Sequence, residues 1–127
     1  MTDELVKREK GVPEMLEATR VTAEEVIERM QRGEPIVFVD ARREDAWGSS
    51  GETLPGAVRL NPDGFARDDT LPVIPIDRSV VTYCTCAQET SSARVAKLLA
   101  RRGYTDVHPL HGGLEGWRRA GGELVPK

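Results

Sequence analysis

The residues best suited to chemistry in this 127-residue chain are its two cysteines, Cys84 and Cys86. They follow an apolar run at residues 80–83 with the composition of a strand, and they precede a Ser/Thr cluster and a helix-period segment. A thiol at such a turn faces unpaired backbone N–H groups and the positive end of the helix dipole, which stabilise the reactive thiolate. Burial as a small apolar side chain is the alternative for one of them. It does not explain why both lie at the turn, so we expect a catalytic thiol here.

The loop around and after the thiols is suited to holding an anion. Residues 87–92 offer consecutive backbone amides and several hydroxyl groups, which would form an anion-binding nest if they wrapped around a sulfur. The hydroxyl groups also suit N-capping of the next helix, and one turn can serve both purposes. The candidate loop residues beside the cysteines are Thr85, Ala87, Gln88, Glu89, Thr90, Ser91 and Ser92.

Two further polar groups need an explanation. Asp40 and Arg42 follow an apolar run, and an aspartate that bonds the backbone of its turn beside a paired arginine accounts for them structurally. His108 and His111 could be combined with the two cysteines as zinc ligands. The Cys-x-Cys spacing is too tight for most tetrahedral sites, so we predict no metal site.

Alternating helices and strands must position these groups. Thr22 and Glu25 form a capping box that predicts the start of a helix, and Gly33 predicts its end. The continuous apolar run at residues 36–39 is typical of a strand buried on both faces of a parallel sheet. Alternating strands and helices predict a mainly parallel sheet with its ligand site at the carboxyl ends of the strands. Further strands are expected at residues 58–60, 80–83 and 107–110, and further helices at residues 90–102 and 114–120.

Composition sets the broad class of the protein. The length suits one domain, expected at residues 21–127, after a charged arm or short helix at residues 1–20. A net charge of −3 argues against a nucleic-acid partner, and no apolar stretch is long enough to cross a bilayer. The N-terminus lacks the form of a signal peptide, and the cysteines are not a secreted disulfide framework. We therefore expect a cytoplasmic protein without a membrane or nucleic-acid partner.

Three segments, in order, resemble the motifs of the rhodanese superfamily of sulfurtransferases. They are residues 37–42 (Val-Phe-Val-Asp-Ala-Arg), residues 54–58 (Leu-Pro-Gly-Ala-Val) and residues 110–117 (Leu-His-Gly-Gly-Leu-Glu-Gly-Trp). Because they flank a strand, a cysteine loop and a helix, the chain is similar to a single-domain rhodanese over residues 22–117. The Cys-x-Cys-x-x-Glu-x-x-Ser pattern also resembles a bacterial subgroup with a double-cysteine loop. The resemblance implies an α/β rhodanese-like fold, with a mainly parallel central sheet and helices on both faces.

The resemblance also implies sulfur transfer without a cofactor. A cysteine thiolate takes the outer sulfur of thiosulfate, a polysulfide or a persulfide, and the resulting enzyme persulfide passes it to a thiol or cyanide. A sulfur-carrier protein is a further partner consistent with this chemistry. Many relatives carry a basic loop residue that holds an anionic donor, whereas this loop carries Glu89, which disfavours dianionic thiosulfate if it points inward. Asp40 and Arg42 are expected to support the loop.

The choice between the two cysteines depends on the direction of counting. From the strand, Cys84 takes the family's active position, whereas counting back from the helix and Gly103 aligns Cys86 without a gap. Burial fixes strand register and loops tolerate insertion, so we favour Cys84, with Cys86 as the alternative or as a resolving thiol. A phosphatase or arsenate reductase of this fold needs an arginine six residues after the nucleophile. This chain has Thr90 six residues after Cys84 and Ser92 six residues after Cys86, which argues against that class of enzyme. A non-catalytic redox-sensing or sulfur-carrier module is the second candidate function.

Overall fold

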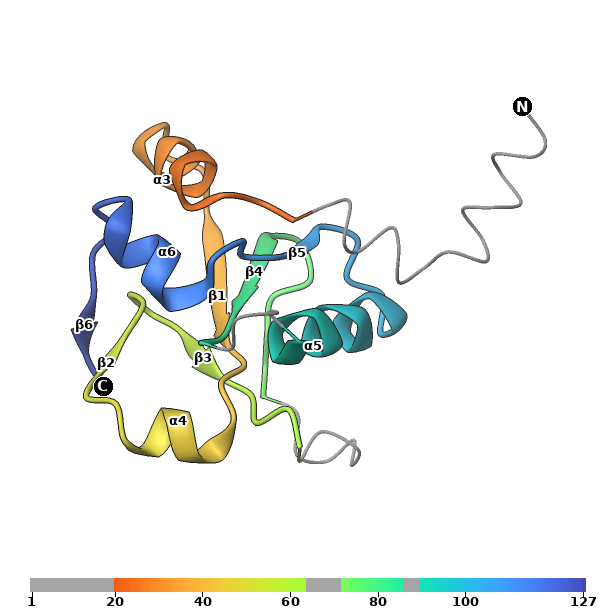
Figure 1. Ribbon diagram of the computed structural model, residues 1–127. Helices are drawn as coiled ribbons and strands as arrows, with labels where there is room; N and C mark the ends of the chain where they lie inside the picture. Colours follow the sequence, from red (N-terminus) through yellow and green to blue (C-terminus); the bar gives the residue numbers. More distant parts are fainter. Residues whose placement is uncertain (1–19, 64–71, 86–89) are drawn as a thin grey trace, which may run out of the picture.

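The alternation of helices and strands is present in the computed structural model, which describes residues 20–63, 72–85 and 90–127 (Figure 1). The arm expected at residues 1–20 therefore lies outside the described residues, apart from Arg20. Within the described ranges, no helix is long and apolar enough to span a bilayer. The elements are α3 (Ala23–Gln31), β1 (Ile36–Asp40), α4 (Glu44–Gly48), β2 (Glu52–Thr53), β3 (Val58–Arg59), β4 (Ser79–Tyr83), α5 (Thr90–Arg101), β5 (Val107–Pro109), α6 (Gly113–Arg119) and β6 (Val125–Pro126).

The capping box opens α3 as predicted. The Thr22 hydroxyl accepts a hydrogen bond from the Glu25 amide at 3.1 Å, and the Glu25 carboxylate accepts one from the Thr22 amide at 2.8 Å. The two bonds satisfy amides that the first helical turn leaves unpaired. Gly33, just beyond the helix, has φ of +86°, a conformation that glycine adopts without steric cost.

The central sheet is parallel, with strand order β3-β1-β4-β5. This order confirms the mainly parallel sheet expected from the sequence. β1 and β4 pair along five residues, from Ile36 opposite Ser79 to Asp40 opposite Tyr83. The two strands therefore end at the same level, and Cys84 follows directly at the carboxyl edge of the sheet. This is the edge where parallel α/β sheets bind ligands.

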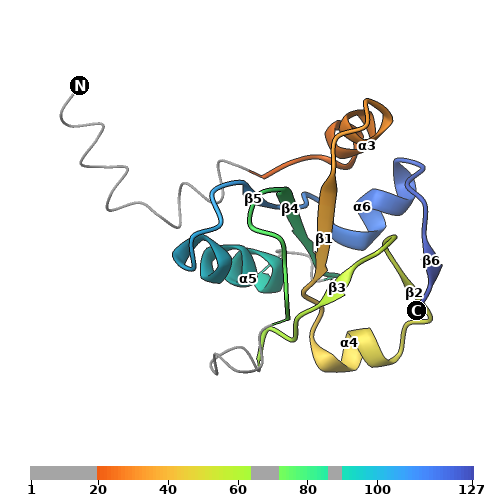
Figure 2. The same ribbon diagram turned by 180° about the vertical axis from the view of Figure 1, so that it is seen from behind.

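Side chains that alternate along each strand form a core on both faces of the sheet. Phe38 and Val81 pack in one cluster with residues of α3 and α6, whereas Val39 and Val80 pack in the other with residues of α5. The two views of the ribbon show α3 and α6 on one side of β1 and β4, and α5 on the other (Figures 1 and 2). Helices thus cover both faces, as expected. In the first cluster, Phe38 and Trp117 meet edge to face, with ring centroids 5.2 Å apart.

Three short elements were not predicted. β2 and β6 form a separate antiparallel pair in which Thr53 lies opposite Val125, and two-residue strands leave no periodicity in the sequence. α4 has only five residues, and its N-cap, Arg43, makes no side-chain capping bond. The strand expected at residues 58–60 is shorter, because β3 ends at Arg59.

Candidate active site around Cys84

The Cys84 thiol lies at the junction of β4 and α5. Its side chain is 1% exposed, and its Sγ donates to the Oγ of Ser92 over 3.6 Å. Ser92 is completely buried in the first turn of α5, and its carbonyl accepts a hydrogen bond from the Thr82 hydroxyl at 2.8 Å. The strand before the cysteine is thereby tied to the beginning of the helix after it. The sulfur consequently lies near the helix end whose dipole favours negative charge.

The main chain of Cys84 is held by the first two residues of α6, Gly113 and Leu114. The Leu114 amide donates a hydrogen bond of 3.0 Å to the Cys84 carbonyl. Gly113 has φ of +58°, and a Cβ at this position would lie only 2.2 Å from that same carbonyl oxygen. Glycine is therefore required by backbone conformation and by close approach together. This explains one glycine of the motif at residues 110–117.

A small cavity of about 80 Å³ opens beside the thiol. A water molecule takes about 30 Å³ in the liquid, so this space accepts only a small group or the tip of a larger one. Two larger hollows, of about 280 and 230 Å³, lie elsewhere, and the described residues that line them include no cysteine. Because Cys84 lines the smallest of these three cavities, that cavity belongs to the candidate site. It is lined by Arg43, Asp45, Ala46, Cys84, Thr85 and Ser91.

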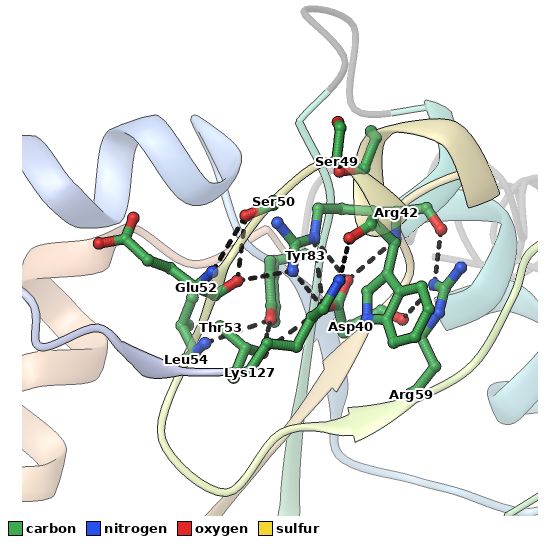
Figure 3. A network of polar contacts seen from close by, with 12 residues as sticks. Asp40, Arg42, Ser49, Ser50, Glu52, Thr53, Leu54, Arg59, Tyr83 and Lys127 are labelled. Atoms are coloured by element: carbon green, nitrogen blue, oxygen red, sulfur yellow. Dashed lines mark hydrogen bonds and ion pairs between the residues drawn. The ribbon is translucent and has the colours of Figure 1, made fainter.

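Asp40 and Arg42 form a buried ion pair at the end of β1 (Figure 3). Arg42 donates from Nε to Oδ1 of Asp40 at 2.9 Å and from Nη2 to Oδ2 at 2.7 Å, and both side chains are at most 2% exposed. Nη2 also donates to the carbonyl of Glu52 at 2.9 Å. Burial alone would lower the pKa of Arg42, but the hydrogen bonds and charge of Asp40 raise it above its ordinary value. The arginine is therefore a permanent cation that fixes the end of β1 to β2.

Tyr83 connects this ion pair to the cysteine. Its ring lies 5.8 Å from the guanidinium carbon of Arg42, and its hydroxyl is 2.7 Å from the Thr53 hydroxyl and accepts from the Leu54 amide at 3.3 Å (Figure 3). Burial, followed by the charge of Asp40, raises the pKa of Tyr83 to about 12. The phenol thus stays neutral at physiological pH. These contacts of the phenol hold Tyr83, the last residue of β4, in place immediately before Cys84.

The structure brings together part of the predicted site. Cys84, Thr85 and Ser91 line the cavity, and Ser92 contacts the sulfur. Thr90 is exposed at the first position of α5. Arg42, paired with Asp40, lies beside Tyr83, the residue before Cys84. The expected support of the loop by Asp40 and Arg42 stays a prediction. The remaining predicted loop residues lie outside the described residues: Cys86, Ala87, Gln88 and Glu89.

The two histidines have other surroundings. His108 Nε2 lies 2.7 Å from the Asp106 carboxylate, and His111 Nδ1 lies 3.4 Å from the Arg20 guanidinium. Among the described residues, no group of histidine, cysteine and acidic side chains could hold a metal ion. Because Cys86 is not among them, the expected absence of a metal site stays a prediction.

Sequence reasoning missed the wall of the cavity that α4 provides. Arg43, Asp45 and Ala46 line it, although none had been selected as a candidate. A usable signal existed, because the residues that follow a central parallel strand lie at the same sheet edge as the cysteine. The loop residues from Cys84 to Ser92 contain no basic side chain, whereas Arg43, which is far away in sequence, lines the same cavity.

The fold and the site define a class: α/β domains that present a cysteine where a central parallel strand meets a helix. Comparison with known proteins is consistent with this. The chain belongs to the rhodanese-like domain family, whose model matches residues 22–120.

Individual relatives agree with this assignment. The thiosulfate sulfurtransferase GlpE of Actinobacillus succinogenes is 34% identical over 104 residues, which cover 81% of this chain and 86% of that protein. GlpE of Pseudomonas savastanoi pv. phaseolicola is 30% identical over 104 residues, covering 82% and 91%. The 3-mercaptopyruvate sulfotransferase structure of SseA from Escherichia coli matches with a TM-score of 0.68 and 23% identity, covering 86% of this chain and 50% of that one. The last comparison confirms the rhodanese fold.

Proposed function

We propose that this chain is a sulfurtransferase that carries a sulfane sulfur as a persulfide on Cys84. The observation that carries the proposal is the placement of the Cys84 sulfur beside Ser92 in the first turn of α5, at the wall of a small cavity. A developing anion on sulfur is stabilised by that helix end. The named activity of the two GlpE relatives supports the same chemistry.

The reaction consists of two displacements at sulfur. In the first, the Cys84 thiolate attacks the outer sulfur of the donor, a new S–S bond forms, and the donor's S–S bond breaks with its electron pair. Thiosulfate then leaves sulfite, whereas a thiol persulfide leaves the thiol. In the second, a thiolate or cyanide attacks the outer sulfur of the enzyme persulfide and restores the Cys84 thiolate. No electron is gained or lost overall, so no redox cofactor enters either step.

Several finer features belong to the proposal. The donor is a persulfide, a polysulfide or thiosulfate, and the acceptor is a small thiol, with a sulfur-carrier protein as a further candidate. Cys86 acts as a resolving thiol, as the similarity to the double-cysteine subgroup suggests. The intracellular, cytoplasmic location expected from the sequence is also part of this proposal.

Intact mass spectrometry tests the proposal. After incubation with thiosulfate, polysulfide or cysteine persulfide, the chain should gain about 32 Da, one sulfur atom, and lose it on mixing with cyanide. Cys84→Ser should abolish the gain, and Cys86→Ser should retain it. The reverse pattern would assign the persulfide to Cys86. A loss of about 2 Da without any sulfur gain would identify a dithiol–disulfide module instead.

A further inference from the structure

The cavity wall formed by α4 has little to hold it from within. α4 has five residues, none of them buried, and its N-cap, Arg43, makes no side-chain capping bond. An isolated helix of this length is unstable in water, so contacts with the rest of the fold keep it in place. The segment supplies Arg43, Asp45 and Ala46 to the cavity wall. The contacts that hold α4 therefore also set the space beside the Cys84 thiol.

The contacts on the outer side of α4 are weak. Arg43 Nε lies 3.8 Å from the Asp63 carboxylate, and the two side chains are 66% and 49% exposed. Asn61 donates a hydrogen bond of 3.2 Å to the Glu44 carboxylate, also at the surface. Polar contacts at such exposure contribute little to stability, so they alone would leave α4 loosely held.

Arg59, the last residue of β3, contacts this segment on both sides of its cavity-lining residues. Its Nη1 donates to the carbonyl of Asp40 at 3.1 Å and to that of Arg42 at 2.6 Å (Figure 3). Its guanidinium carbon lies 4.8 Å from the ring centroid of Trp47, and its Nη2 lies 3.6 Å from the Glu44 carboxylate. Arg42 precedes the three lining residues and Trp47 follows them. One side chain, only 23% exposed, thus joins both ends of the wall to the sheet.

The chemistry of arginine suits this position. A guanidinium group donates to carbonyls in its plane while its charge lies over an aromatic ring. Lys127 adds a second cation, 3.9 Å from the ring centroid of Trp47, and its amide donates to the Gly51 carbonyl at 2.9 Å. Trp47 itself is half-buried. α4 is therefore held through its tryptophan and through the backbone before it.

We propose that Arg59 is a positioning residue of the Cys84 site, which holds α4 at the carboxyl edge of the sheet and so keeps the cavity narrow. Arg59 is not among the described residues that line the cavity, so it acts through α4. This inference refines the proposed function, on which it rests for the identity of the reaction. The access of a reagent to Cys84 can nevertheless be measured without sulfur transfer.

The test is the rate at which iodoacetamide alkylates Cys84 in the full chain carrying Cys86→Ser. Arg59→Met removes the charge and the hydrogen bonds but keeps an unbranched stem. It should raise the rate roughly three- to tenfold, because a loosened α4 admits the reagent more often. Trp47→Leu removes the aromatic ring from the other side of the contact and should also raise the rate. Urea denaturation gives the folded fraction of each variant, so that the rates are compared for the folded chain.

Arg29→Met is the matched control. The Arg29 side chain is also 23% exposed, and it bonds Glu34 and Ser79 at the opposite, amino end of the strands. A merely structural role of Arg59 would lower the free energy of unfolding and leave the alkylation of the folded chain as it is in the control. An equal rate in Arg59→Met and Arg29→Met would therefore overturn the proposal, as would an unchanged rate in both Arg59→Met and Trp47→Leu.

Sulfur loading provides the second readout. Arg59→Met should lower kcat/KM for the donor, because the wall that positions the donor has moved, whereas Arg29→Met should keep it. Equal kcat/KM values in the two variants would count against the positioning role. Failure of every donor to load sulfur on the wild-type chain would reject the proposed function, and the alkylation rates would still decide the role of Arg59.

Discussion

The amide of Leu114 donates a hydrogen bond to the carbonyl of Cys84 across 3.0 Å, joining the start of α6 to the end of β4. These residues are thirty positions apart in the chain. The contact forms only because Gly113, just before Leu114, carries no side chain. The C-terminal motif thereby acts on the candidate site through the backbone of the cysteine.

Gly113→Ala should displace the Cys84 main chain. The added Cβ would lie 2.2 Å from the Cys84 carbonyl oxygen, so the backbone must shift in addition to adopting a strained φ. We expect a loss well above about 1–2 kcal/mol in the free energy of unfolding, the cost of the left-handed conformation alone. Urea denaturation measures it. Gly56→Ala is the control, since Gly56 has φ of +68° and open space around the added atom. Equal losses in the two variants would contradict the close-approach argument.

Ser92→Ala should lower the reactivity of Cys84. The hydroxyl lies 3.6 Å from the sulfur and accepts from the neutral thiol, but it can rotate and donate to the thiolate, and the bond to the anion is the stronger of the two. A net difference of about 0.5–1.5 kcal/mol corresponds to roughly two- to tenfold in rate. The measurement is the rate of alkylation by iodoacetamide at neutral pH, in the Cys86→Ser background. Ser91→Ala removes the neighbouring hydroxyl and leaves the 3.6 Å contact intact. A slower rate in both variants to the same extent would indicate a general disturbance of α5.

Asp40→Asn should destabilise the fold strongly. It leaves Arg42, which is 1% exposed, without its carboxylate, and breaking one side of a buried pair costs about 3–5 kcal/mol. Adding Arg42→Met should recover part of the loss, because the buried charge is then gone. Chemical denaturation measures each step. Glu28→Gln breaks an exposed pair on α3 and should cost at most about 1 kcal/mol. A similar small loss for Asp40→Asn would refute the structural importance of the buried pair.

Tyr83 should make the fold sensitive to alkaline pH. Its pKa in the folded state is about 12, whereas an unfolded tyrosine releases its proton near its ordinary value of about 10. The resulting stability is fully present below about pH 10 and is lost as the pH rises towards 12. Tyr83→Phe should therefore show a shallower decline over this range than the wild type. Tyr104→Phe, which alters the other tyrosine, should keep the decline that Tyr83 causes. Identical pH profiles for wild type and Tyr83→Phe would contradict the assignment.

The sequence was sufficient for those elements whose signal is local. The capping box at Thr22 and the apolar runs before Asp40 and Cys84 predicted α3, β1 and β4, and burial on both faces predicted a parallel sheet. The placement of Cys84 after a central strand followed from the same pattern. Each of these properties depends on residues that are neighbours in the chain.

The parts that were missed depend on distant contacts. β2 has only two residues and exists because β6 pairs with it, so Glu52 and Thr53 carry no strand pattern of their own. The Arg43–Asp63 contact joins segments on either side of β2 and β3. The dependence of Cys84 on Gly113 likewise involves backbone proximity that no spacing rule describes.

The walls of the Cys84 cavity come from the start of α4, the residue pair after β4 and the first turn of α5. These segments are separated in the chain and meet at one edge of the parallel sheet, so the chemical environment of the thiol is a property of the cooperatively folded domain. Cysteine reactivity should therefore serve as a reporter of global folding. In increasing denaturant, the altered alkylation rate of Cys84 and the loss of near-ultraviolet circular dichroism should follow a single transition.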